Sequence, residues 1–137
     1  MPKVYITRRE TFSAAHRLHN PAFSDAENVR VYGICNNLKG HGHNYELEVV
    51  IAGEVDRETG MIMNLVELKQ IMLDEIIRHV DHKHLNEDVD FLRGINPTAE
   101  NLVVVFWKIL SNRIPRGLLH EVRLRETENN ISIYRGE

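Results

Sequence analysis

The chain has 137 residues, of which 42% are hydrophobic and 27% charged, and its formal net charge is -3. This size suits one domain with an apolar core, and the acidic balance argues against nucleic acid as the main partner. No apolar run approaches the roughly 18 residues of a membrane span, and the N-terminus lacks the apolar core of a secretory signal. Cys35 is the single cysteine, so no intrachain disulfide can form, and we expect a cytoplasmic setting.

The first third of the chain predicts two strands joined by a long loop. Residues 3–16 are rich in β-branched and aromatic side chains, which is typical of a strand. Residues 19–40 contain Asn, Pro and Gly and predict a loop, within which SDAENVRVY has the composition of a short helix. Residues 41–52 predict a second strand whose alternate positions form one apolar face: Tyr45, Leu47, Val49 and Ile51.

Two helices are expected in the middle of the chain. The first covers residues 64–80, where Asn64 and Glu67 resemble a capping box. The second covers residues 96–112, and Pro97 suits the first helical position. Both segments carry apolar residues at helical spacing, so each is expected to pack one face against a core.

Two short strands, residues 120–127 and 131–135, are predicted to close the chain around a turn at residues 128–130. The order ββααββ predicts an α+β domain with two helices on one face of a four-stranded antiparallel sheet. Such a sheet has open edges, and proteins commonly pair or cover them, so a closed oligomer is expected.

Three of the eight histidines have the spacing of metal ligands. His41 and His43 begin a strand and share one face, with Cα atoms about 6.7 Å apart. His16 ends the preceding strand, so a hairpin would bring it to the same site. Three imidazoles with an open position are typical of catalytic zinc, although zinc, copper, iron and nickel all accept such ligands. An incidental histidine pair remains the alternative. The remaining histidines with no such partners are interpreted as surface or packing residues: His19, His79, His84 and His120.

Cys35 lies six residues before His41, in a polar loop containing glycine. A nearby cation and a histidine would favour its thiolate, which could act as a base or nucleophile. It could equally be a fourth zinc ligand, which would make the site structural. The residues alone leave both roles open, beside the ordinary case of a small buried hydrophobe.

Asp81 and His82 follow the first expected helix. A carboxylate with an imidazole is a common arrangement for proton transfer. Adjacent side chains rarely hydrogen-bond each other, so we expect each to serve a third group. The alternative is an ordinary helix C-terminus, where the helix dipole favours histidine.

Glu126 shares strand parity with the apolar residues Val122 and Leu124. An unpaired buried charge is costly, so a carboxylate on that face calls for donors. The aminopyrimidinone edge of a pterin or guanine offers two parallel N–H groups that match its oxygens. The alternative is that this end of the strand is exposed.

These features together resemble the 6-pyruvoyl-tetrahydropterin synthase family across nearly the whole chain. The matching segments are FSAAHRL at 12–18, CNNLKGHGHNY at 35–45, GMIMNL at 60–65, VDHKHLN at 80–86, PTAEN at 97–101 and ETENNISIYRGE at 126–137. The resemblance implies a single T-fold domain over residues 1–137, with trimers whose sheets close into a barrel. Two trimers would form a homohexamer with active sites between subunits.

The resemblance also implies roles for individual residues. The zinc ligands would be His16, His41 and His43. Cys35 would transfer a proton, and Asp81 with His82 would complete the relay. Glu126 would anchor the pterin, with help from Thr98. Arg17 and Lys39 are the candidates for binding the triphosphate.

The implied reaction converts 7,8-dihydroneopterin triphosphate to 6-pyruvoyl-tetrahydropterin and eliminates triphosphate. No nicotinamide or flavin is needed, and no glycine-rich dinucleotide motif is visible. An alternative is 6-carboxy-tetrahydropterin synthase, but that branch typically has its cysteine four residues before the HGH motif, whereas Cys35 stands six before. A noncatalytic zinc-stabilised binding module, with Cys35 as fourth ligand, is the alternative from another class.

Overall fold

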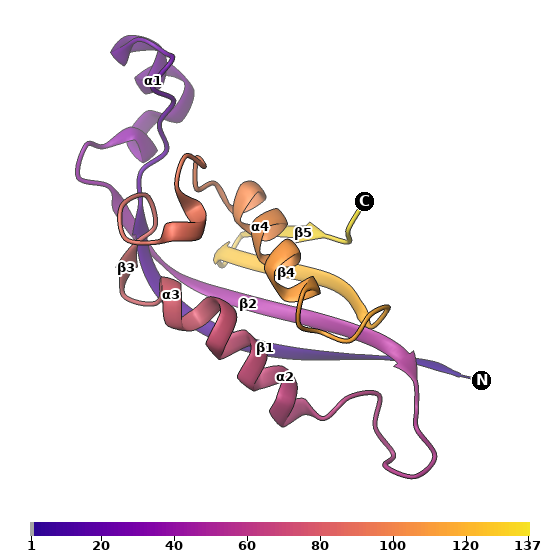
Figure 1. The fold of residues 1–137 in the computed structure, drawn as a ribbon. Coiled ribbons are helices and arrows are strands. Elements are labelled where there is room, and N and C mark those ends of the chain that lie inside the picture. The colour runs from indigo at the N-terminus through magenta and orange to yellow at the C-terminus, as the bar shows by residue number, and fades with distance from the viewer. Residues whose placement is uncertain (1) are drawn as a thin grey trace.

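The computed structural model describes residues 2–137 and consists of one sheet with helices on one side (Figure 1). The strands are β1 (Lys3–His16), β2 (His41–Glu54), β3 (Lys83–His84), β4 (Leu119–Thr127) and β5 (Asn130–Tyr134). The helices are α1 (Asp25–Tyr32), α2 (Leu65–Met72), α3 (Arg78–Val80) and α4 (Ala99–Ser111). Shorter turns are the 3-10 turns Gly33–Asn36 and Asp90–Leu92 and the π-helical turn Leu73–Ile77.

The sheet has the strand order β3-β1-β2-β4-β5. β1 and β2 pair antiparallel along their whole length, from Lys3 opposite Glu54 to His16 opposite His41. The expectation of four antiparallel strands is wrong by one strand, because β3 pairs parallel to β1 beside Ala14 and Ala15. β3 has two residues, too few to show an alternating pattern in the sequence.

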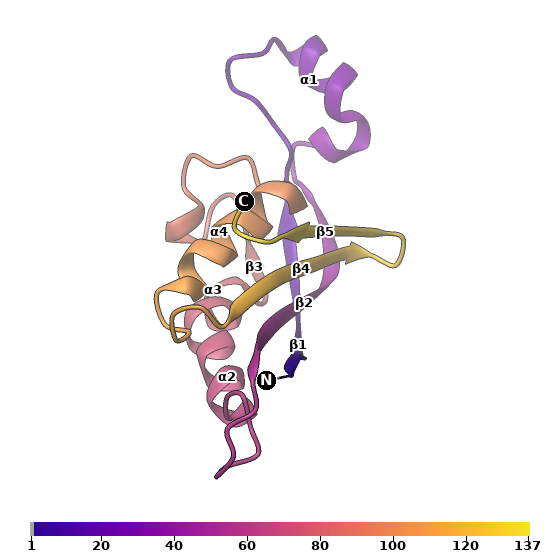
Figure 2. The ribbon, with the colours of Figure 1, turned by 90° about the vertical axis from the view of Figure 1, so that its right-hand side faces the viewer.

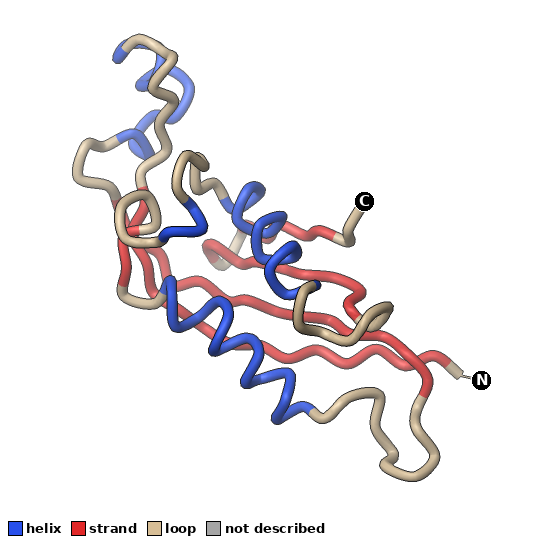
Figure 3. The backbone as a smooth tube through the Cα atoms, viewed as in Figure 1, coloured by secondary structure: helices blue, strands red, loops and turns tan. Residues whose placement is uncertain are grey.

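The two expected helices lie on one face of the sheet (Figures 2 and 3). The first is continuous from α2 through the π-helical turn to α3, and the Asn64 side chain caps it by accepting from Val66 N at 2.9 Å. Thr98 caps α4 by accepting from Asn101 N at 3.1 Å. Pro97 therefore precedes the cap instead of taking the first helical position.

The core lies between these helices and the sheet, where alternate strand residues such as Leu47 and Leu124 meet Leu68 and Phe106. Residues 20–40, which we call the arm, include α1 and project beyond the sheet (Figures 1 and 2). Apart from β3, no strand within residues 2–137 covers the outer edge of β1, and β5 pairs with β4 alone. Two sheet edges are therefore open. No helix in the same residues is both long and apolar enough to span a membrane.

Candidate active site

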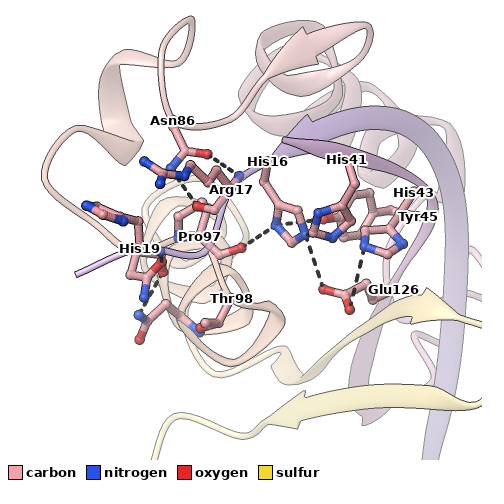
Figure 4. A network of polar contacts seen from close by, with 12 residues as sticks. His16, Arg17, His19, His41, His43, Tyr45, Asn86, Pro97, Thr98 and Glu126 are labelled. Carbon is pink, nitrogen blue, oxygen red and sulfur yellow. Dashed lines mark hydrogen bonds and ion pairs between the residues drawn. The ribbon is translucent and has the colours of Figure 1, made fainter. Parts of the chain in front are cut away.

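Three histidines meet where β1 ends and β2 begins, on the face that also carries the core (Figure 4). His16 is directly opposite His41, and Ala14 is opposite His43, so antiparallel pairing places all three imidazoles on one face. Their candidate ligand atoms lie within 4.8 Å of one another. The spacing of the histidines predicted this cluster, and the strand register produces it.

His16 is held by a backbone contact from Pro97, which is 81 positions away in the sequence. Its Nδ1 lies 2.7 Å from the carbonyl oxygen of Pro97 and 3.3 Å from the hydroxyl of Tyr45. A carbonyl only accepts, so Nδ1 carries the proton and Nε2 keeps its lone pair. That Nε2 lies 3.1 Å from Nε2 of His41. Backbone contacts of this kind orient the histidine ligands of metal sites.

The cluster has the chemistry of a metal site. The pKa of His16 is lowered to about 4, mainly because the ring is buried and also because of the neighbouring histidines, while the hydrogen bond to the Pro97 carbonyl acts in the opposite direction. Burial likewise lowers the pKa of His41. Nδ1 of His41 and Nε2 of His43 are buried and have no hydrogen-bond partner within residues 2–137. Neutral imidazoles with unused nitrogens, gathered at one point, fit a borderline-soft divalent cation such as zinc.

Glu126, from the end of β4, faces this cluster (Figure 4). Its Oε1 lies 3.8 Å from Nε2 of His43 and its Oε2 lies 4.0 Å from Nε2 of His16. Its side chain is 21% exposed, and neither oxygen accepts a hydrogen bond from residues 2–137. The carboxylate is therefore on the covered side, as its strand parity predicts, and retains its full capacity to accept hydrogen bonds.

Cys35 lies in the 3-10 turn Gly33–Asn36 of the arm and is partly buried. Its thiol does not join the cluster of ligand atoms formed by the three histidines. The turn is tied to the end of β1, because Leu18 N donates to the Cys35 carbonyl at 2.9 Å. The cysteine thus stands near the first strand's end without completing a four-ligand site within this chain.

Asp81 and His82 lie between α3 and β3, beside the open edge of β1. The expectation that adjacent side chains would not pair is wrong here, because Nδ1 of His82 lies 3.0 Å from Oδ1 of Asp81. His82 has a φ of 61°, a left-handed conformation rare outside glycine, which turns its ring back toward Asp81. Asp81 also accepts from Ser13 N at 3.0 Å, and this backbone hydrogen bond is the main cause that lowers its pKa.

The remaining candidates separate in space. The hydroxyl oxygen of Thr98 caps α4 by accepting a hydrogen bond, and the hydroxyl proton can still be donated. Arg17 lies on the other side of Pro97 from the histidines (Figure 4), with Nε donating to the Asn36 carbonyl at 3.0 Å. Lys39 is exposed in the turn before β2.

Two residues that support His16 were not identified from the sequence. Tyr45 is fully buried, stacks on Phe12 and is close to His16. It shares strand parity with His41 and His43, which was a usable signal. Pro97 acts through its backbone oxygen, and no side-chain pattern reports such a contact.

Comparison with known proteins decides the family. The model of the family described as 6-pyruvoyl tetrahydropterin synthase matches residues 5–137. The chain belongs to this family. It is 48% identical to the Drosophila melanogaster 6-pyruvoyl tetrahydrobiopterin synthase, covering 98% of this chain and 81% of that one. It is 46% identical to the Homo sapiens protein of the same name, covering 96% and 91%.

The structural comparison agrees. The Caenorhabditis elegans 6-pyruvoyl tetrahydropterin synthase superposes with a TM-score of 0.95 at 41% identity, covering 100% of this chain and 98% of that one. An Archaeoglobus fulgidus protein named as a 6-carboxy-5,6,7,8-tetrahydropterin synthase is 36% identical over 79% of this chain. The resemblance drawn from the sequence motifs is thus confirmed, and the chain belongs to a family of pterin-synthesising enzymes.

Proposed function

We propose that the chain converts 7,8-dihydroneopterin triphosphate to 6-pyruvoyl-tetrahydropterin, eliminating triphosphate, with zinc held by His16, His41 and His43. The cluster of three imidazoles facing a carboxylate that accepts no hydrogen bond from residues 2–137 carries this proposal. The similarity to enzymes of this name supports the pyruvoyl product over the 6-carboxy product. When bound, zinc would act as a Lewis acid toward the hydroxyl groups of the substrate's side chain.

Glu126 would bind the pterin. Its two oxygens accept no hydrogen bond from residues 2–137, and a partly buried carboxylate without donors is unfavourable. The pterin edge supplies two N–H donors in a geometry that a carboxylate binds with both oxygens. Thr98, with a free hydroxyl proton, would donate to the same ring. This pair would orient the substrate so that its side chain points toward the histidines.

Proton transfer would fall to Cys35, Asp81 and His82. The Cys35 thiolate would remove a proton from carbon, and His82, paired with Asp81, would move protons at the other side of the substrate. His82 is suited to exchange protons, because 82% of its side chain is exposed and its Nδ1 is fixed on Asp81.

These groups do not gather at one point within a single chain, which supports an active site shared between subunits. Cys35 is on the projecting arm, whereas Asp81 and His82 are beside the edge of β1. The free edges of β1 and β5 provide a means of association, since unpaired strands readily pair with another chain. We propose trimers in which the sheets close into a barrel, and two trimers per homohexamer, each chain contributing one domain of residues 1–137.

Product analysis tests the function directly. The zinc-loaded protein is incubated with 7,8-dihydroneopterin triphosphate and the products are identified by mass spectrometry. We expect 6-pyruvoyl-tetrahydropterin and free triphosphate, with no product from the matched Cys35→Ala protein. A 6-carboxy product would assign the chain to the paralogous reaction, and substrate left intact would favour a noncatalytic zinc-binding module.

A further inference from the structure

The segment that leaves α3 runs along the outer edge of β1 and contains Asp81, His82 and then β3 (Figure 1). β3 pairs with β1, and the Ala15 carbonyl accepts from Leu85 N at 2.8 Å. Alternate residues of an antiparallel strand direct both of their peptide groups to the same side. The peptide groups of Ser13, like those of Ala15, are therefore directed to this outer edge and not to β2.

Ser13 contacts both residues of the carboxylate–imidazole pair through its backbone. Its N–H donates to Oδ1 of Asp81 at 3.0 Å, and its carbonyl oxygen accepts from His82 N at 2.6 Å. Oδ1 of Asp81 lies 3.0 Å from Nδ1 of His82. One residue of β1 thus makes a hydrogen bond to each of two consecutive residues, which also contact each other.

The side chain of Ser13 takes no part in these contacts. Its hydroxyl donates to Oδ1 of Asn44 at 2.6 Å, across the paired strands β1 and β2. Pairing of β1 with β2 does not use the Ser13 N–H, because that group donates to Asp81 at the outer edge. The contact with the pair therefore depends on the peptide groups at position 13 and not on the serine side chain.

His82 needs such support because its backbone conformation is unfavourable. Its φ is 61°, and a left-handed conformation outside glycine persists only where the surrounding contacts enforce it. The hydrogen bond from His82 N to the Ser13 carbonyl is one such contact. The preceding residue is fixed as well, since Asp81 N donates to the Ile77 carbonyl at the end of the helix, at 2.9 Å.

The same contacts determine which nitrogen of His82 carries the proton. An ionised carboxylate only accepts hydrogen bonds, so Nδ1 of His82 is protonated and Nε2 of the neutral ring has the lone pair. The hydrogen bond from Ser13 N keeps Asp81 in this accepting form, because it is the main cause that lowers the pKa of Asp81. The His82 side chain is 82% exposed, so the lone pair on Nε2 is accessible.

We propose that Ser13 is a positioning residue for proton transfer. Its two peptide groups hold Asp81 and His82 so that Nδ1 of His82 stays protonated and Nε2 is the atom that accepts and returns a proton. The part of His82 in the reaction rests on the proposed function. The tautomer does not, since the hydrogen bond at one ring nitrogen sets the state of the other.

The nitrogen chemical shifts of the His82 ring test this arrangement in the assembled, zinc-loaded protein labelled with 15N-histidine. The signals are assigned by their absence from His82→Asn, at a pH where the ring is neutral. We expect the Nδ1–H tautomer in the parent. Ser13→Pro removes the N–H that Asp81 accepts, and proline is tolerated where a strand directs its N–H away from the ladder. The ratio of Nδ1–H to Nε2–H tautomer should fall by about threefold to tenfold.

Two matched variants separate the peptide group from the side chain and from proline itself. Ser13→Ala keeps both peptide groups and should keep the tautomer ratio of the parent. Thr7→Pro places proline at a residue of the same parity in β1, whose N–H is directed to the part of the edge that β3 does not cover. It should also keep the ratio, because Thr7 does not contact the pair.

If Ser13→Pro does not fold, the same hydrogen bond is tested from its other end. Asp81→Ala removes the acceptor, so the amide proton of Ser13 should exchange with solvent about tenfold to a hundredfold faster than in the parent. NMR measures the rate, and Ser13→Ala assigns the signal. An Nε2–H tautomer in the parent, an unchanged ratio in folded Ser13→Pro, or equal exchange rates in the parent and Asp81→Ala would each overturn the proposal.

Turnover separates this proposal from the proposed function. Ser13→Pro should lower kcat by about tenfold or more and change KM less, with zinc content unchanged, because the metal ligands lie elsewhere. An unaltered kcat beside a lost Nδ1–H tautomer would overturn Ser13 as a positioning residue. A parent that shows the tautomer and forms no product would sink the proposed function, whereas the nitrogen shifts would still support the hold of Ser13 on His82.

Discussion

The carboxylate of Glu126 lies 3.8 Å from Nε2 of His43, across the pair of strands β4 and β2. At this distance the two groups do not share a hydrogen bond, so each keeps its bonding capacity for something between or beside them. The imidazole has a lone pair to offer a cation, and the carboxylate has two oxygens to offer a donor. In the function that we propose, the histidines form the metal-binding part of the site and Glu126 the pterin-binding part, and the two parts are adjacent.

Glu126→Gln tests the pterin-binding part. The substitution keeps the volume but turns one acceptor oxygen into an NH2 donor facing a pterin N–H. A lost hydrogen bond to a charged group costs about 1.5–3 kcal/mol, and an unsatisfied group adds to that, so affinity for a pterin analogue should fall about tenfold to a thousandfold. Fluorescence titration measures it. Zinc content should not change, and an unaltered affinity would remove Glu126 from the pterin site.

The metal-binding part predicts about one zinc per chain. His41→Ala should lose both metal and activity, because it removes one of three ligands. Elemental analysis after dialysis measures the zinc. His79→Ala is the control, since that exposed histidine packs on Phe91 outside the cluster and should keep full occupancy. Full zinc in a protein with all three ligands replaced by Ala would contradict the site.

Cys35→Ala should retain zinc, because the thiol is outside the cluster of ligand atoms. It should lose turnover, because the substitution removes the proposed proton-transferring group. Cobalt substitution distinguishes the roles by absorption spectroscopy. An intense sulfur-to-cobalt charge-transfer band in the parent, absent from Cys35→Ala, would make the cysteine a ligand and the site structural. We expect no such band.

The open edges of β1 and β5 predict that the protein associates in solution, and the resemblance to the family implies that the assembly is a hexamer. Light scattering coupled to size exclusion should give six times the mass of one chain. A monomer that keeps full activity at micromolar concentration would refute both the hexamer and the site shared between subunits.

Glu121 predicts a pH dependence of stability. Its side chain lies on the face of the sheet that the helices do not cover, and it is buried there. It accepts hydrogen bonds from Arg123 and, at 2.7 Å, from Nε of Arg135. Burial alone would raise its pKa, but the two arginines reverse this, so the pKa lies below its usual 4.5. A carboxyl whose pKa is lower in the folded state stabilises it above about pH 4.5, and this contribution is lost as the pH falls through the folded value.

Glu121→Gln should therefore lower the free energy of unfolding by about 1–3 kcal/mol at pH 7. Chemical denaturation followed by circular dichroism measures the difference, which should shrink as the pH falls below 4.5. Glu128→Gln, at an exposed turn position, is the control and should change little. A difference that stayed constant down to pH 3 would show that the ion pairs do not stabilise the fold.

The sequence by itself determined the four longer strands, the two core helices and the cluster of three histidines. The first strand runs from Lys3 to His16 as expected, because its composition and its length of alternating residues are local properties. The cluster followed from the same property, since side chains two apart on a strand share a face and a hairpin brings strand ends together. Glu126 faces the covered side for the same reason.

Tertiary structure alone decided how these residues are held. The carbonyl of Pro97 reaches His16 across 81 positions of sequence, and β3 pairs with β1 although it has two residues. His82 turns back onto Asp81 because its backbone adopts a conformation that no pattern of residues reports. His19 and His84 line the same cavity, because segments that are distant in the sequence pack together there. Periodicity reports which face a residue takes, whereas contacts between distant segments depend on how the whole chain packs.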